Sequence, residues 1–105
     1  MPHYLVRFSY PPEVWAGLIA NPEDRRDEIR KIAEPLGGSL VGYWYAFGDY
    51  DGYVVLELPD NVSAAAVLAD IAASGAARVS TTPLLTVEET LEALARARGV
   101  GRRAP

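Results

Sequence analysis

Apolar side chains recur along the chain in two patterns, and the first of them predicts strands. Segments rich in β-branched and aromatic residues and bounded by Gly, Pro, Asn or Asp are typical of strands. Four segments have this pattern: residues 3–9, 39–47, 53–58 and 77–82. Residues 48–52 connect the second strand to the third and are rich in Gly and Asp, so we expect a hairpin there.

The second pattern predicts helices, because apolar residues recur every three or four positions. We expect a short helical segment at residues 13–20, and longer helices at 22–36, between Asn61 and Gly75, and from Thr86 onwards. On the last of these helices we expect Val87, Leu91 and Leu94 to face the core. The two tryptophans, Trp15 and Trp44, are expected to pack between helices and sheet, with a place at a pocket mouth as the alternative for Trp15.

Capping residues set the expected ends of these helices. Asn21 is predicted to cap the second helix, with Pro22 at its first position, and Gly37 to end it in the left-handed conformation. Asp60 stands before the third helix, and Thr86 and Glu89 have the spacing of a capping box. The resulting order, β-α-β-β-α-β with a C-terminal helix, predicts an α+β fold with a four-stranded antiparallel sheet of the ferredoxin-like, split β-α-β type.

Length and charge narrow the class of protein. The 105 residues are enough for one domain, expected at 1–97, followed by a flexible basic tail at 98–105. Residues 1–95 carry six basic and fourteen acidic side chains, a net charge of −8, which argues against nucleic-acid binding. The chain has no apolar run of transmembrane length and no N-terminal pattern of a signal peptide, so we expect a cytoplasmic protein that does not bind membranes.

Several kinds of chemistry are excluded by residue usage. The absence of cysteine excludes disulfides, thiolate catalysis and Cys-based metal or iron–sulfur sites. A single histidine, His3, cannot form a histidine cluster, and the chain has no Gly-rich phosphate loop, so we expect neither a metal nor a cofactor. Asp49 and Asp51 flank Tyr50 and could contribute two carboxylates to a cation site, but two carboxylates without further ligands make a poor site. Turn formation explains these residues better.

An ordered set of short stretches resembles the GYD domain family, small bacterial proteins. The stretches are Tyr4-Leu5-Val6, Leu36-Gly37-Gly38, Ala46-Phe47-Gly48-Asp49-Tyr50-Asp51, Leu58-Pro59-Asp60-Asn61, Ser74-Gly75-Ala76 and Thr82-Pro83-Leu84-Leu85-Thr86 with Glu88-Glu89. The resemblance implies a ferredoxin-like fold of the dimeric α/β-barrel type and a homodimer, and no established substrate. Related dimeric α/β-barrel families include cofactor-free monooxygenases, lactone isomerases, haem-degrading enzymes and ligand-sensing domains, so a function does not transfer from the fold.

Strict alternation along each strand divides the side chains between two faces of the sheet. The almost wholly apolar set should face the helices: Tyr4, Val6, Phe8, Leu40, Gly42, Trp44, Ala46, Val54, Leu56, Leu58, Val79 and Thr81. The opposite set mixes aromatic and polar residues: His3, Leu5, Arg7, Ser9, Val41, Tyr43, Tyr45, Phe47, Asp51, Tyr53, Val55, Glu57, Arg78, Ser80 and Thr82. Pairing two such sheets would cover the aromatic residues of the second set.

The mixed face is also the predicted site. Its ligand-binding candidates are Arg7, Tyr43, Tyr53 and Arg78, with Trp15 at the mouth, and its catalytic candidates are Glu57, Tyr45 and His3. These groups suit a small aromatic or anionic organic molecule. The structural alternative is that Glu57 pairs with Arg7 or Arg78 inside a dimer core, and His3 as an exposed terminal residue is the alternative to a general base.

Two functional hypotheses follow from this face. In the first, a homodimer binds a small organic molecule and converts it without a cofactor, as a monooxygenase, isomerase or cyclase. In the second, a non-catalytic module senses a ligand or presents its surface to a partner protein. Haem or metal binding is a third and weaker hypothesis, because it would depend on His3 alone.

Overall fold

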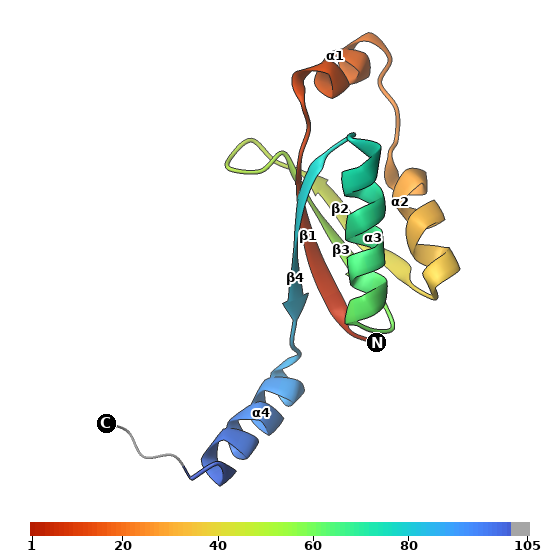
Figure 1. Cartoon of the computed structure of the whole chain (residues 1–105). Helices are drawn as coiled ribbons and strands as arrows, with labels where there is room; N and C mark the ends of the chain where they lie inside the picture. The colour runs from red at the N-terminus through yellow and green to blue at the C-terminus, as the bar shows by residue number, and fades with distance from the viewer. Residues whose placement is uncertain (102–105) are drawn as a thin grey trace.

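The computed structural model describes residues 1–101, and its centre is one antiparallel sheet (Figure 1). The strands lie in the order β2-β3-β1-β4. They are β1 (His3–Ser9), β2 (Ser39–Tyr45), β3 (Gly52–Glu57) and β4 (Arg78–Leu84). Consecutive strands β1 and β2 are separated by β3, and β3 and β4 by β1, so two β-α-β units interleave. The predicted α+β class and the four-stranded antiparallel sheet are confirmed.

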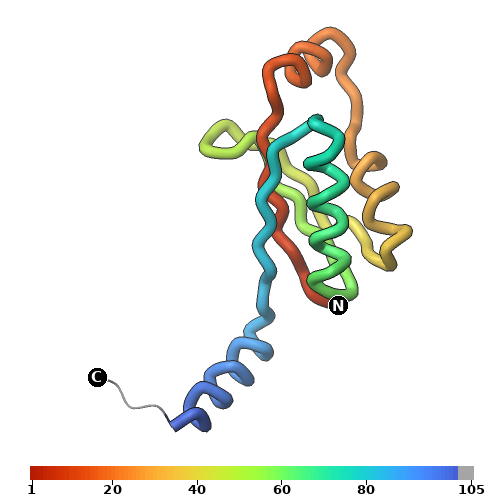
Figure 2. The backbone as a smooth tube through the Cα atoms, in the orientation of Figure 1, coloured from red at the N-terminus to blue at the C-terminus, as the bar shows by residue number. Residues whose placement is uncertain are grey.

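Helices α2 (Arg26–Ala33) and α3 (Asn61–Ser74) cover one face of this sheet. We call this the helix face and the opposite one the open face. A single 3-10 turn, η1 (Glu34–Leu36), follows α2. Helix α1 (Pro12–Ala20) stands beyond one end of the sheet, and α4 (Val87–Gly99) projects from the other end, away from the body (Figures 1 and 2). In the described part of the chain, no helix has the length and apolar composition to cross a membrane.

The core lies between the helix face and helices α2 and α3. Its buried side chains are Tyr4, Val6, Phe8, Val54, Leu56 and Leu58 from the β1 and β3 region, with Ala33, Ala64 and Val67 from the helices. The alternation of buried and half-buried residues along β1 and β3 agrees with the predicted faces of these two strands.

Most predicted helix ends are confirmed. The Asp60 carboxylate accepts a hydrogen bond from the Ser63 backbone N–H at 2.8 Å, and Thr86 and Glu89 form both bonds of the capping box. Gly37 and Gly75 have φ of 81° and 70°, the left-handed conformation that ends a helix without a Cβ penalty.

The predicted cap at Asn21 is wrong, because α2 begins only at Arg26. The residues in between make local polar contacts instead. Asp24 Oδ1 accepts from the Arg26 backbone N–H at 3.0 Å, and Arg25 Nε lies 3.2 Å from Glu23 Oε1. A short acidic side chain that bonds the backbone two residues on competes with helix formation.

The predicted faces of β2 are wrong from Gly42 onward, because the strand contains a β-bulge. Leu40 is opposite Leu56 of β3, but the register shifts before Gly42. Tyr43 is then opposite Val54 on the helix face, and Trp44 is opposite Tyr53 on the open face. The extra residue of a bulge reverses the face of every later side chain. Tyr43 and Tyr45 therefore lie on the helix face, and Trp44, which is 56% exposed, does not pack under a helix.

The last helix also departs from the prediction. Val87, Leu91 and Leu94 are 72%, 61% and 61% exposed, so within residues 1–101 they do not face a core. The helix includes Arg98 and Gly99, the first two residues of the expected tail, and residues 102–105 of that tail lie outside the described residues.

Candidate functional site

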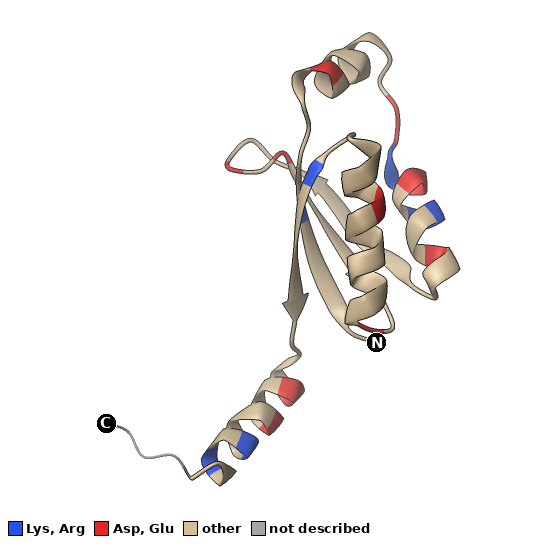
Figure 3. Ribbon diagram, in the orientation of Figure 1, with Lys and Arg blue, Asp and Glu red and all other residues tan. Residues whose placement is uncertain are grey.

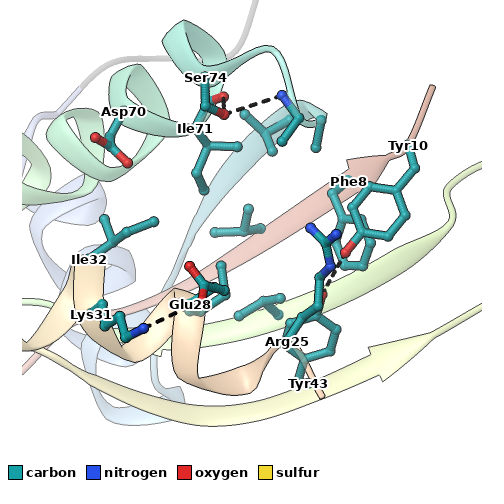
Figure 4. A pocket seen from close by; sticks show the side chains of 16 residues that line it. Phe8, Tyr10, Arg25, Glu28, Lys31, Ile32, Tyr43, Asp70, Ile71 and Ser74 are labelled. Carbon is teal, nitrogen blue, oxygen red and sulfur yellow. Dashed lines mark hydrogen bonds and ion pairs between the residues drawn. The ribbon is translucent and has the colours of Figure 1, made fainter. Parts of the chain in front are cut away.

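A cavity of about 310 Å³ lies between the helix face of the sheet and helices α2 and α3. The sheet contributes its floor, the two helices contribute its walls, and most of the lining is apolar (Figure 4). The lining residues on the sheet side are Val6, Phe8, Tyr10, Tyr43, Val54, Ala77 and Val79. Isoleucines of α2 and α3, Ile29, Ile32 and Ile71, complete the apolar wall. The volume lies at the lower limit of the range usual for small-molecule sites, about 300–1,000 Å³.

One end of the cavity carries hydroxyl groups and a positive charge. The hydroxyls of Tyr10 and Tyr43 are 3.0 Å apart, and Tyr43 donates to the Tyr45 hydroxyl at 3.4 Å. The guanidinium carbon of Arg25 lies 5.5 Å from the centre of the Tyr10 ring. Figure 4 shows the side chains of Arg25, Tyr10 and Tyr43 gathered at this end. We call these three residues the polar end.

Burial changes the titration of the two tyrosines at the polar end. Desolvation raises the pKa of Tyr10 from its usual 10.0 to about 12. The pKa of Tyr43 is also raised, first by desolvation and then by its hydrogen bonds with Tyr10 and Tyr45. Both hydroxyls are therefore protonated at neutral pH and do not serve as bases. Since Tyr43 donates its one proton to Tyr45, the bond between Tyr10 and Tyr43 is donated by Tyr10.

Arg25 reaches the cavity from the segment before α2. Its side chain is 26% exposed, and its Nε faces Glu23 Oε1 at 3.2 Å. Nε itself is buried and has no partner in hydrogen-bonding geometry among the residues that the structure describes. A half-buried guanidinium beside an aromatic ring is suited to a planar ligand with a negatively charged oxygen.

An aromatic cluster packs around the two tyrosines of the polar end. It consists of Phe8, Tyr10, Trp15, Tyr43 and Tyr45, whose neighbouring ring centres are 4.9–6.4 Å apart. Asp51 ties α1 to this cluster, because its Oδ2 accepts from the Tyr10 backbone N–H at 2.8 Å and from the Trp15 indole at 3.2 Å. The orientation of the Tyr10 backbone thus depends on a carboxylate from the β2–β3 connection.

Charged side chains stand where α2 and α3 face each other across the cavity. Lys31 Nζ lies 3.5 Å from Glu28 Oε1 on α2, and Asp70 and Ser74 come from α3 (Figure 4). All four are exposed. This rim is polar and accessible, whereas the floor is apolar and buried.

The residues predicted for one site are divided between the two faces of the sheet. Tyr43 lines the cavity, and Trp15 and Tyr45 belong to the aromatic cluster that packs around the polar end. The remaining five residues do not line this cavity: His3, Arg7, Tyr53, Glu57 and Arg78. Their strand register places them on the open face, because His3 is opposite Glu57, Arg7 is opposite Tyr53, and Ser9 is opposite Arg78. The expectation of a single face was wrong, since it assumed strict alternation through β2.

On the open face, polar side chains contact their neighbours across the sheet. Arg7 Nη2 donates to Thr82 Oγ1 at 2.7 Å, and its guanidinium carbon lies 5.3 Å from the centre of the Tyr50 ring. His3 Nε2 lies 3.2 Å from Glu57 Oε1. Within the single described chain, residues 1–101, the nearest basic side chain to Glu57 is therefore that of His3.

Two residues of the polar end, Tyr10 and Arg25, were not among the residues predicted for the site. The bulge residue Val41 carries no signal of its own, and without the bulge Tyr43 would not face these residues. The structure brings no three His, Asp or Glu side chains together as a metal site within its described part.

The comparison with known families gives one match. Residues 4–94 match the model of the family described as GYD domain, so the match begins in β1 and ends within α4. It confirms the resemblance seen in the ordered stretches. Curated protein sequences give no match to the chain.

Proposed function

The chain belongs to the GYD domain family, and from this premise we propose that it binds a small, largely apolar organic molecule in the cavity between its sheet and helices α2 and α3. The observation that supports this most directly is the composition of the cavity. Apolar walls surround about 310 Å³, and one end carries two tyrosine hydroxyls and a guanidinium. Concave, mostly apolar spaces with a few convergent polar groups are typical of ligand sites.

The polar end indicates the chemistry of the ligand. Flat aromatic rings of Phe8, Tyr10 and Tyr43 line the sheet side of the cavity at this end, so a planar aromatic body fits there. A protonated tyrosine hydroxyl that turns from its tyrosine neighbour to the ligand donates to an oxygen atom, and Arg25 stabilises negative charge on that oxygen. We therefore propose an aromatic ligand with a carbonyl, phenolic or carboxylate oxygen.

Cofactor-independent conversion of this molecule is the enzymatic form of the proposal. Negative charge that develops on an enolate or phenolate oxygen would be stabilised by Arg25 and by a hydrogen bond from Tyr10 or Tyr43, whose proton would turn from its tyrosine neighbour to that oxygen. This form does not use Glu57 and His3, because both lie on the open face. A non-catalytic ligand-sensing module would use the same contacts, and turnover of the captured molecule distinguishes the two forms.

We propose further that the protein is a homodimer paired through its open face, as in a dimeric α/β barrel. Only α2 and α3 pack extensively on the sheet within the described residues, and both are on the other face. The open face includes the large exposed side chain of Trp44 and the half-buried Leu5 and Val55. A second copy of the same face would bury these apolar side chains.

Native mass spectrometry of the protein as purified, followed by equilibrium dialysis with 1-naphthol as an aromatic probe, tests the ligand site. We expect a retained mass or bound probe. Val79→Phe should weaken binding at least about tenfold, since the larger ring fills space on the cavity floor. Tyr43→Phe should weaken it about fivefold, the value of one lost hydrogen bond of about 1 kcal/mol.

The matched control is Val62→Phe, the same change at a 78% exposed position of α3 that does not line the cavity. Val62→Phe should bind the probe like the wild type. The proposal fails if neither a retained mass nor probe binding is observed, or if Val79→Phe and Val62→Phe bind equally well.

A further inference from the structure

Helix α4 presents an apolar surface that the rest of the described chain does not cover. Val87, Leu91 and Leu94 are all at least 61% exposed, and the preceding Leu85 is 64% exposed. The helix projects from the end of β4 away from the sheet (Figures 1 and 2). Four large apolar side chains close together on a short segment are costly to leave in water, so the surface indicates an interaction site.

The spacing of these residues is that of a helix-pairing seam. Val87, Leu91, Leu94 and Arg98 are separated by four, three and four positions, which places them on one stripe of the helix. Beside the stripe stand the small side chains of Thr90, Ala95 and Ala97. Small flanking residues allow two helix axes to approach closely. The helix has 13 residues, about 20 Å at 1.5 Å per residue.

The charges of α4 are divided between its two ends. Acidic residues occupy the first turn, Glu88 and Glu89, and basic residues occupy the last turn, Arg96 and Arg98 (Figure 3). Two such helices in parallel would place like charges together. In the antiparallel arrangement each acidic end lies beside a basic end, and the two helix dipoles are also opposed favourably.

We propose that α4 pairs antiparallel with α4 of a second copy of this chain. In the register that centres the stripe, Leu91 lies opposite Leu94 of the second copy. The aliphatic part of Arg98 then covers Val87 of the second copy, and its guanidinium reaches the neighbouring Glu88. The contact is isologous, so each of these pairs occurs twice.

This contact is independent of the ligand cavity and of the open face. Helix α4 does not line the cavity, and pairing through it leaves the open face available for its own partner. A protein that uses both contacts assembles into more than two copies, and one that uses α4 alone forms a dimer. The residues proposed for the α4 contact can be changed without touching the core, because Glu88 and Arg98 are exposed.

A charge-exchange experiment on the full chain tests the antiparallel pair. Glu88→Arg and Arg98→Glu are prepared separately, one of them with a mass tag, and their assembly is measured by native mass spectrometry and sedimentation velocity. Each variant alone places like charges together at both ends of the seam. We expect each variant alone to lose one step of the association found in the wild type, with a dissociation constant for that step at least about tenfold larger. The equimolar mixture of the two variants should recover this step and form a mixed assembly.

Two results would overturn the α4 contact. One is an assembly state shared by the wild type and both single variants. The other is loss of association in each variant without recovery in the mixture, which would mean that α4 docks on another surface. Leu91→Asp provides a second measurement, since it should remove the same step of association whatever the charges. Circular dichroism of each variant, which should show the helix content of the wild type, checks that the change has not unfolded a helix.

Discussion

At the level of single residues, Tyr43 shows how strongly the candidate site depends on one side-chain direction. Its hydroxyl lies 3.0 Å from that of Tyr10, and its ring packs 5.6 Å from that of Phe8. Each hydroxyl in this group is partly shielded from water, and its nearest polar neighbours are other tyrosines. A phenol in such surroundings resists ionisation, because the loss of hydration of the charged form outweighs the attraction of Arg25.

The free energy of unfolding at alkaline pH should depend on this shielding. The pKa of Tyr10 is about 12 in the folded chain and 10.0 in its usual range, so the folded state holds the proton more tightly. The contribution of Tyr10 to the free energy of unfolding is fully present below about pH 10. It is lost as the pH rises from 10 towards 12, because the unfolded chain releases the Tyr10 proton first. Since Tyr10 is only half-buried, solvent screening reduces this contribution to the free energy of unfolding to roughly 1 kcal/mol.

Urea unfolding at a series of pH values, for the wild type and for Tyr10→Phe, measures this contribution. Tyr10→Phe should lower the free energy of unfolding at neutral pH by about 1 kcal/mol, through the lost bond to Tyr43. It should also show a shallower decline above about pH 10, where Tyr10 begins to differ between the folded and unfolded states. Parallel pH profiles for the two proteins would contradict the assignment to Tyr10.

At the level of elements, the β2–β3 hairpin places the site. Its bulge before Gly42 turns Tyr43 and Tyr45 to the helix face, and the Trp44 ring lies over the Gly42 backbone where a Cβ would otherwise stand. At the other end of the hairpin, Gly52 is buried and pairs with Tyr45. A Cβ at Gly52 would overlap the Phe8 ring and lie 2.7 Å from the Trp44 carbonyl oxygen.

Substitutions at two glycines of this hairpin separate packing from loop flexibility. Gly52→Ala should lower the free energy of unfolding by about 2–3 kcal/mol, because the added methyl group has no room between Phe8 and the β2 backbone. Gly48→Ala should change it by less than about 0.5 kcal/mol, since a Cβ there meets no atom within 4 Å. Urea unfolding of both variants measures the two changes in the free energy of unfolding. Equal changes would count against the packing described for Gly52.

At the level of the whole molecule, residues 1–101 cover the sheet on one side only. Leu5 and Val55 are opposite each other at the middle of the open face, and both are half-buried in the single chain. Their half-burial results from neighbouring strands and not from a covering helix. Because the cavity lies on the other face, a homodimer paired through the open face leaves the proposed ligand site intact in each copy.

Val55→Glu should prevent the open-face pairing, because two copies of a carboxylate would be buried at the centre of the interface without a partner. The expected result in sedimentation velocity is loss of this association, with probe binding in the cavity retained. Val62→Glu, on exposed α3, is the matched control and should assemble like the wild type. Unchanged assembly of Val55→Glu would exclude pairing through the open face.

Much of the fold follows from short stretches of sequence. The strands at residues 3–9 and 53–58 need only alternation, and the ends at Asp60, Gly75 and Thr86 need only a capping residue and its near neighbours. These features are determined locally, because the groups that satisfy each helix end lie within a few residues of it. Membership of the GYD domain family was likewise evident from the ordered stretches and is confirmed by the family match.

The site itself was decided only by the tertiary structure. Residues 39–47 carry large apolar or aromatic side chains in both registers, so alternation alone does not distinguish the two faces of β2. The choice depends on pairing with β3 and on the packing of Tyr43 and Tyr45 against Phe8 and Tyr10, which are far away in sequence. The exposure of α4 has the same origin: its apolar stripe is visible in the sequence, but what it faces is set by the direction in which the chain leaves β4.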